Sequence, residues 1–182
     1  NYVGSFAPPF AVVNDRRYLA TLDPRDVRAG MAEAVKVALL RDPTFFEWLW
    51  RNAEDLAACD SRAIQHLVRR TAELHLDHIA QSGDPFEHGA AKPLDYGHWA
   101  AHKLESLSHY DLRHGEAVAV GLAIDSRYAV ERGLLSEQVV ARVCVLLERL
   151  GFTLWHDSLT ARTETGQRTV IAGLEEFREH LG

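Results

Sequence analysis

Residues 92–121 read KPLDYGHWAAHKLESLSHYDLRHGEAVAVG, and they contain His98, His102 and His114. His98 and His102 are four residues apart, so on a helix they project from one face, one turn from each other. Asp95 stands where a helix beginning at Tyr96 would take an N-cap acceptor. We therefore predict a helix that begins at Tyr96 and presents two imidazoles side by side.

A second histidine position follows this helix. After a polar break over residues 108–113, His114 opens a segment that then becomes strongly apolar. Two helices joined by a short turn bring two imidazoles together, which is two thirds of a three-ligand catalytic metal site. The third ligand must come from elsewhere in the chain.

The candidate for that ligand lies in residues 28–41, RAGMAEAVKVALLR, which are predicted to form a helix. From Ala29 to Leu40 this segment is apolar on nearly every side apart from Glu33 and Lys36, and such a helix is buried. A buried charge is paired or bound to a metal, because stranding it costs several kcal/mol.

Two explanations of the buried charges stay open at this point. Glu33 and Lys36 are three residues apart and can form an ion pair on one helix face. Alternatively, Glu33 binds a divalent cation with His98 and His114, while Lys36 faces an anionic substrate. Glu116, next to His114, is either an acceptor for that imidazole or a first-turn acid favoured by the helix dipole.

The rest of the chain is predicted to be helical after an extended start. Periodicity, caps and breakers predict extended segments over 1–14, a helical entry at 23–24 and helices over 28–41, 44–59, 61–79 (capped by Ser61), 136–150 and 169–181. Gly151 is expected to stop the helix that precedes it.

Composition narrows the class of protein. The chain has 182 residues, enough for one domain, and 47% of them are hydrophobic, enough for a core. Its formal net charge is −6 and it has no basic block, which argues against nucleic acid or a membrane surface as partner. Cys59 and Cys144 lack CxxC spacing, so we expect small buried thiols in a reducing cytoplasm.

Taken together, these segments resemble the sugar phosphate cyclases, the family of 3-dehydroquinate synthase. RAGMAEAVK at 28–36 is similar to the family's metal-ligand helix. LDYGHWAAH at 94–102 and RHGEAVAVG at 113–121 are similar to its GHxxxH and HGEAVA elements. The opening residues 1–22 resemble the segment that crosses from the NAD-binding domain into the helical domain.

The resemblance implies a mainly α fold, namely the helical bundle-like C-terminal domain of a 3-dehydroquinate synthase-like protein, over residues 23–182. Residues 1–22 would be an extended segment leading from an NAD-binding domain. Carried over position by position, the resemblance implies that Glu33, His98 and His114 bind zinc or cobalt. It implies that Lys36 and Asp95 contact the substrate and that His102 assists proton transfer. It also implies that Asn1 and Thr21 contact NAD or the substrate beside it.

The implied activity is a carbon–oxygen lyase reaction on a sugar phosphate. NAD transiently oxidises a hydroxyl, phosphate is eliminated, and an intramolecular aldol step closes a carbocycle. The family also implies a homodimer. No GxGxxG loop occurs in this sequence, so the NAD-binding domain would precede Asn1, and we expect the isolated chain to be inactive although able to bind metal.

Departures from the quinate-forming enzymes bear on the substrate. This chain has Asp95 where those enzymes have Asn, and Ala91 where they have Arg. Their upstream substrate-binding lysine aligns near Asp77 of this chain. A phosphate-binding lysine near the C-terminus is replaced at best by Arg178. Fewer basic groups favour a neutral substrate such as a heptulose 7-phosphate. Two alternatives remain: a metal-dependent polyol or alcohol dehydrogenase, and a non-catalytic helical scaffold.

Overall fold

The computed structural model describes residues 10–82 and 95–180. For residues 79–82 and 178–180 it describes the backbone only. Within these residues the chain is helical, and the one β-type pairing is an isolated antiparallel bridge between Arg162 and Arg168. The elements are η1 (Arg16–Thr21), α1 (Pro24–Arg41), α2 (Pro43–Arg51), α3 (Ala53–Ala57), α4 (Ser61–Ser82), α5 (His98–Leu107), α6 (His114–Glu131), α7 (Glu137–Arg149), η3 (Asp157–Thr160), η4 (Thr169–Ile171) and α8 (Ala172–His180). The expected mainly α, bundle-like fold is confirmed.

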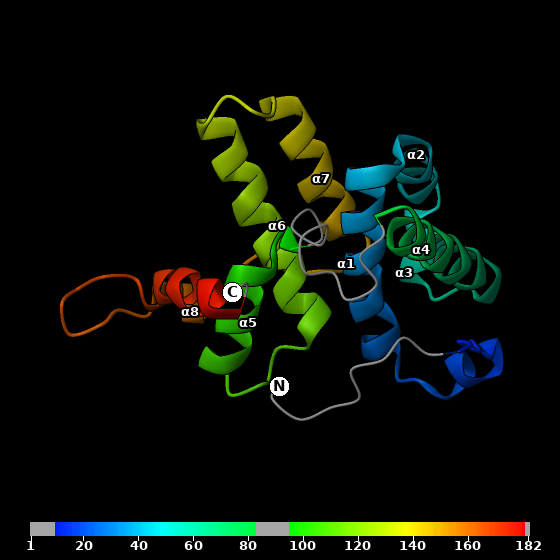
Figure 1. Cartoon of the computed structure of the whole chain (residues 1–182), viewed down its shortest axis with the longest axis horizontal. Helices are drawn as coiled ribbons and strands as arrows, with labels where there is room; N and C mark the ends of the chain where they lie inside the picture. Colours follow the sequence, from blue (N-terminus) through cyan, green and yellow to red (C-terminus); the bar gives the residue numbers. More distant parts are fainter. Residues whose placement is uncertain (1–9, 83–94, 181–182) are drawn as a thin grey trace.

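Helix α1 lies at the centre of the molecule. It packs against α2 and α4 on one side and against α6 on the other, and α6 in turn packs against α5 and α7 (Figure 1). Every residue from Met31 to Ala38 except Glu33 is buried, as the apolar pattern predicts. The largest fully buried side chains come from six helices and include Met31, Leu49, Leu56, Leu104, Leu122 and Leu146.

Several helix boundaries differ from the predicted ones for local reasons. Helix α1 starts at Pro24, four residues early, because the side chain of Asp23 accepts a hydrogen bond from Arg25 N and proline suits the first turn. The helix expected over 44–59 is two helices that meet at Asn52, whose side chain donates to Trp48 O at 2.7 Å.

The caps of the later helices confirm one prediction and correct another. Ser136 caps α7, and Gly151 ends the turn after it with a positive φ of 92°. At α4, however, Asp60 rather than Ser61 is the cap, because its Oδ1 accepts from Arg62 N and Ala63 N. The helix expected over 169–181 begins as the 3-10 turn η4 before α8.

The N-terminal segment is only partly extended. Residues 1–9 lie outside the described part, and residues 10–15 are irregular without a strand partner there. Residues 16–21, expected to be extended, form the 3-10 helix η1, which Asp15 caps through Arg17 N at 3.0 Å. The proposed division at residue 22 stays a prediction.

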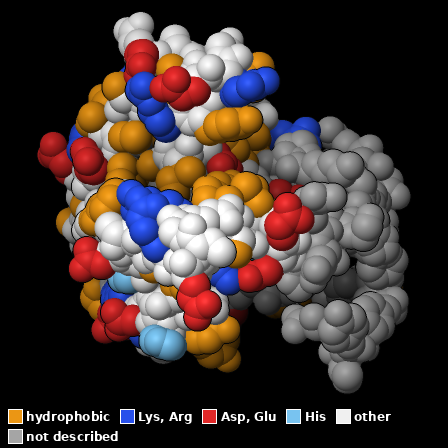
Figure 2. All heavy atoms as spheres, turned by 90° about the vertical axis from the view of Figure 1, so that its left-hand side faces the viewer, with side chains coloured by type: hydrophobic (Ala, Val, Ile, Leu, Met, Phe, Trp, Pro, Cys, Tyr) orange, Lys and Arg blue, Asp and Glu red, His pale blue; other side chains and the backbone are white. Residues whose placement is uncertain are grey.

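Two surface properties bear on partners. None of the described helices combines the length and apolarity that a membrane crossing requires. On the face that carries α8, acidic and basic side chains are interspersed rather than gathered by sign (Figure 2).

Candidate metal centre

Three helices bring one candidate ligand each to a common point. Glu33 comes from α1, and His98 and His114 are the first residues of α5 and α6. Oε1 of Glu33 lies 3.3 Å from Nε2 of His98 and 3.6 Å from Nε2 of His114. One donor atom from each residue lies within 4.8 Å of the other two. The structure therefore brings together the three residues that the sequence analysis proposed as metal ligands.

The environment of Glu33 suits a divalent cation. Its Oε1 is buried and has no hydrogen-bond partner among the described residues. Leaving a buried carboxylate oxygen unsatisfied is costly, so such an atom calls for an explanation. Two imidazoles and a carboxylate form a donor set known from catalytic zinc sites. A cation at this point would satisfy the orphaned oxygen.

The other oxygen of Glu33 makes an ion pair. Its Oε2 lies 2.7 Å from Nζ of Lys36, whose side chain is only 6% exposed. The two explanations left open by the sequence are therefore compatible, because each uses a different oxygen. Burial raises the pKa of Glu33, but the imidazoles of His114 and His98 and the ammonium of Lys36 outweigh it and hold the pKa well below its usual range. The carboxylate is thus ionised, as a metal ligand must be.

His114 is the more exposed of the two imidazoles. The carboxylate of Glu33 raises the pKa of His114, burial opposes this, and Glu105 adds to the rise. Because a metal ligand must be a neutral imidazole, a cation and a proton compete for this ring.

Two glycines let α6 approach the other ligand-bearing helices. A Cβ on Gly115 would lie 1.8 Å from the carbonyl oxygen of Ala29, so α6 rests on the backbone of α1 one turn before Glu33. A Cβ on Gly121 would lie 1.9 Å from the carbonyl oxygen of Gly97, beside the start of α5. No pattern in the sequence marks these glycines as determinants of the site.

The start of α5 differs from the prediction. The helix begins at His98 instead of Tyr96, and its N-cap is Gly97 with φ 82°, so Asp95 is not the N-cap. Instead, Asp125 of α6 accepts hydrogen bonds from Gly97 N at 2.7 Å and from Nε1 of Trp99 at 2.6 Å. Burial raises the pKa of Asp125, and these two donors oppose the rise.

Asp125 was missed by the sequence analysis. The available clue was its position four residues after Gly121, on the same face of α6. Its carboxylate ties the first turn of α5 to α6 and thereby fixes where His98 lies.

The remaining predicted site residues fall into two groups. His102 lies on α5 with its ring 5.7 Å from that of His98 and its side chain 53% exposed. Asp95 is half-buried just before α5. Lys36, His98 and His102 therefore surround the same point as Glu33.

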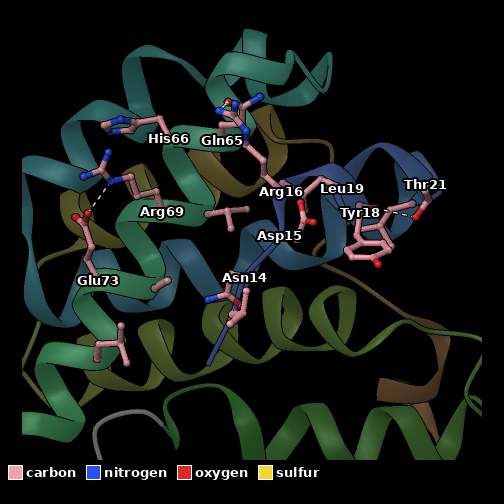
Figure 3. Close-up of a pocket in the computed structure, with 15 residues that line it drawn as sticks. Asn14, Asp15, Arg16, Tyr18, Leu19, Thr21, Gln65, His66, Arg69 and Glu73 are labelled. Carbon is pink, nitrogen blue, oxygen red and sulfur yellow. Dashed lines mark hydrogen bonds and ion pairs between the residues drawn. The ribbon is translucent and has the colours of Figure 1, made fainter. Parts of the chain in front are cut away.

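Thr21 lies elsewhere. It is on η1, on the side of α1 away from α5 (Figure 1), and its hydroxyl donates to Tyr18 O at 2.8 Å. It lines an open groove of about 810 Å³ between η1 and α4 (Figure 3). Asn1 lies outside the described residues, so the structure does not place it.

Comparison with known proteins identifies the class. Residues 30–169 match the family described as 3-dehydroquinate synthase C-terminal. The chain belongs to the 3-dehydroquinate synthase family of sugar phosphate cyclases. This agrees with the resemblance seen in the sequence motifs.

Relatives of this cyclase family include enzymes with different products. The chain is 37% identical over 180 residues to 2-epi-valiolone synthase of Actinosynnema mirum, covering 98% of this chain and 46% of the relative. It is 38% identical over 157 residues to 3-dehydroquinate synthase of Xylella fastidiosa, covering 83% of this chain and 42% of the relative. The chain thus spans about half the length of the curated relatives it matches.

A solved structure of the family shares the fold. It is 2-epi-5-epi-valiolone synthase from Streptomyces hygroscopicus with NAD⁺ and Zn²⁺ bound. The TM-score is 0.74 at 29% identity, over 92% of this chain and 45% of that one.

Proposed function

We propose that this chain is the metal-binding helical part of a metal- and NAD-dependent sugar phosphate cyclase. The reaction would eliminate phosphate from a seven-carbon sugar phosphate and close a carbocycle by an intramolecular aldol step. The observation that carries the proposal is the convergence of Glu33 Oε1 with Nε2 of His98 and of His114, at 3.3 and 3.6 Å. Its relatives among the 3-dehydroquinate and valiolone synthases support the reaction class.

Glu33, His98 and His114 would hold the cation, with zinc as the first choice and cobalt as a substitute. A divalent cation there supplies Lewis acidity, which stabilises negative charge as it develops on a substrate oxygen. The bound Zn²⁺ in the valiolone synthase structure supports this choice.

Lys36 and His102 would act on the substrate. Lys36 keeps a buried ammonium beside Glu33, which orients that carboxylate and offers a positive charge to an anionic substrate. His102 is exposed, and its Nδ1 faces Glu105 at 3.1 Å, so Nε2 is the ring nitrogen left to exchange a proton near the departing phosphate.

Asp95 would favour a substrate without a carboxylate. A half-buried acid just before α5 would repel a second carboxylate, so a heptulose 7-phosphate fits better than a keto-acid phosphate. The similarity to valiolone synthases supports this preference.

The proposal extends to NAD, assembly and location. NAD would bind beside Asn1 and Thr21, which is supported by the NAD⁺ in the related valiolone synthase structure. We further propose a cytoplasmic homodimer that binds neither nucleic acid nor membrane, in keeping with the acidic net charge of −6.

The test uses the natural protein that carries this chain. Its metal content would be measured alongside Glu33→Ala and His114→Ala, with Glu137→Ala on the exposed first turn of α7 as control. Phosphate release and ring closure would be followed with NAD and either a heptulose 7-phosphate or the seven-carbon keto-acid phosphate. We expect Glu33→Ala and His114→Ala to lose the metal and Glu137→Ala to keep it. We also expect the wild type to turn over the heptulose 7-phosphate.

Two outcomes would overturn the proposal. Hydride transfer without phosphate release would indicate a dehydrogenase. Metal content unchanged by both site substitutions would indicate a scaffold whose histidines are incidental.

A further inference from the structure

Glu105 lies between two of the clustered imidazoles. It is on α5, one turn after His102, and its side chain is only 16% exposed. Its Oε2 lies 3.1 Å from Nδ1 of His102 and 3.2 Å from Nδ1 of His114. One carboxylate oxygen thus contacts both rings. The ring centroids lie 5.5 Å apart, and the ring planes are inclined by 30°.

This contact determines which nitrogen of His114 carries the proton. A carboxylate can only accept, so Nδ1 of His114 must be the protonated nitrogen of the neutral ring. Its Nε2 then presents a lone pair to the point where Oε1 of Glu33 lies, 3.6 Å away. Carboxylates that accept from a metal-binding imidazole in this way orient the ring and raise its basicity.

His98 reaches the same tautomer by another route. Its Nδ1 lies 3.2 Å from the carbonyl oxygen of Tyr96, which also can only accept. The lone pair of His98 is therefore on Nε2 as well, directed at Oε1 of Glu33 at 3.3 Å. Backbone orients one imidazole, and a side chain orients the other.

The neighbouring acid Glu116 does not take this role. Its carboxylate pairs with Nε of Arg25 at 2.7 Å and accepts from Arg113 N at 2.9 Å. The alternative of Glu116 as an acceptor for His114 is thus not the arrangement that the structure shows.

We propose that Glu105 is a positioning residue of the metal centre, which fixes the Nε2-lone-pair tautomer of His114 and ties His102 to it through one oxygen. The inference rests on the proposed function, because it needs a cation on Glu33, His98 and His114. Glu105 itself does not touch the cation. Its loss should weaken metal binding by changing His114, without removing a ligand.

The test compares zinc affinity and ring tautomer in the natural protein. Affinity would be measured by competition with a chromogenic chelator, for Glu105→Leu and Glu105→Gln, with Glu137→Gln as matched control. Leucine keeps the volume but accepts no hydrogen bond, so we expect about 10–100-fold weaker zinc binding. Glutamine still accepts through its amide oxygen, so we expect a loss several-fold smaller than that.

The tautomer gives a second readout. Before zinc is added, long-range ¹H–¹⁵N spectra should show Nδ1 of His114 protonated in the wild type and in Glu105→Gln. In Glu105→Leu they should show a mixture of states. If Glu105→Leu fails to fold, Glu105→Asp replaces it: the shortened carboxylate keeps the charge but withdraws from the rings, and should bind zinc more weakly than Glu105→Gln.

Three results would overturn the inference. The first is a Glu105→Leu variant whose zinc affinity and His114 tautomer equal those of the wild type. The second is a Glu105→Asp variant that binds zinc more tightly than Glu105→Gln. A second zinc equivalent that disappears in Glu105→Gln would make Glu105 a ligand, with His102 and His114, of a separate site. Failure of the proposed function is distinguishable: a scaffold would bind no zinc at the Glu33 site even in the wild type, and a dehydrogenase would show hydride transfer without phosphate release.

Discussion

The close packing of α6 on α1 requires a residue without a Cβ at position 115. The Cα of Gly115 lies so close to Ala29 that an added methyl would overlap its carbonyl oxygen at 1.8 Å. We predict that Gly115→Ala lowers the free energy of unfolding by about 3 kcal/mol, since backbone cannot move aside as a flexible side chain can. Zinc affinity should fall with it, because the shift moves His114 away from Glu33. Urea unfolding and chelator competition measure the two effects.

Gly30 provides the matched control on α1. It is exposed, and a Cβ there meets nothing within 4 Å. Gly30→Ala should raise the free energy of unfolding by up to about 1 kcal/mol, because alanine is the better helix former. If both substitutions were equally harmless, the close approach of α6 to α1 would be wrong.

Asp125 is a second residue whose effect depends on single hydrogen bonds. It faces two donors, Gly97 N and Trp99 Nε1, with one carboxylate oxygen each. In Asp125→Asn the amide offers one acceptor, so one buried donor loses its partner. We predict a loss of about 1–3 kcal/mol in the free energy of unfolding.

The companion measurement for Asp125→Asn is zinc affinity, which should fall because the first turn of α5 carries His98. Asn52, whose side chain bonds within its own helix turn, offers the comparison: Asn52→Ala should leave zinc affinity unchanged. Equal zinc affinity in wild type and Asp125→Asn would contradict the role given to Asp125.

At the scale of elements, Asp42 joins three helices. Its amide bonds Ala38 O at the end of α1, its Oδ1 accepts from Phe45 N at the start of α2, and its Oδ2 lies 2.6 Å from Nη2 of Arg70 on α4. The guanidinium of Arg70, helped by the amide of Phe45, lowers the pKa of Asp42 below its ordinary value.

The sign of the pH dependence follows from that lowered pKa. An acid with a lower pKa in the folded state stabilises the fold above its unfolded pKa of about 3.9, and loses the contribution as pH falls through the folded value. Asn caps as well as Asp does, so Asp42→Asn removes mainly the ion pair. We predict a wild-type advantage of at most about 1 kcal/mol at pH 7, because Arg70 is partly exposed and water screens the ion pair.

The measurement is the free energy of unfolding of wild type and Asp42→Asn from pH 7 down to the acid limit of the native state. The difference should shrink steadily below pH 4. A difference that grows on acidification would contradict the assigned pKa direction.

Helix types were predictable from the sequence, whereas several boundaries were not. The apolar run of α1 predicts a helix that is buried on nearly every side, and the apolar stripe of α7 predicts a helix that is buried on one face. The break at Asn52 was missed, because nothing in the local pattern distinguishes it from a continuous helix. The start of α5 was misplaced because the partner of Gly97 is Asp125, which is distant in sequence and belongs to tertiary structure.

At the scale of the whole molecule, the candidate site was predictable as a list of residues but not as a geometry. Glu33 was identifiable because an acid in an apolar helix needs a reason, and the two histidines because of their motif spacing. Glu105 was not identified, since only the packing of α5 on α6 puts its carboxylate on two rings. The contacts that position ligands are those between segments far apart in the chain.

The arrangement of the three ligand-bearing helices has a consequence for the entire fold. Helix α6 packs against both α1 and α5 (Figure 1), and each of these three helices supplies one candidate ligand. A cation bound by the native state but not by the unfolded chain stabilises it by RT ln(1 + [L]/Kd), about 2.7 kcal/mol at 100 times Kd. Zinc should therefore raise the urea midpoint of the wild type and of Glu137→Ala by the same amount. Glu33→Ala should show no rise, since two imidazoles on separate helices remain without their third ligand; an equal rise in that variant would place the bound zinc outside the meeting point of these helices.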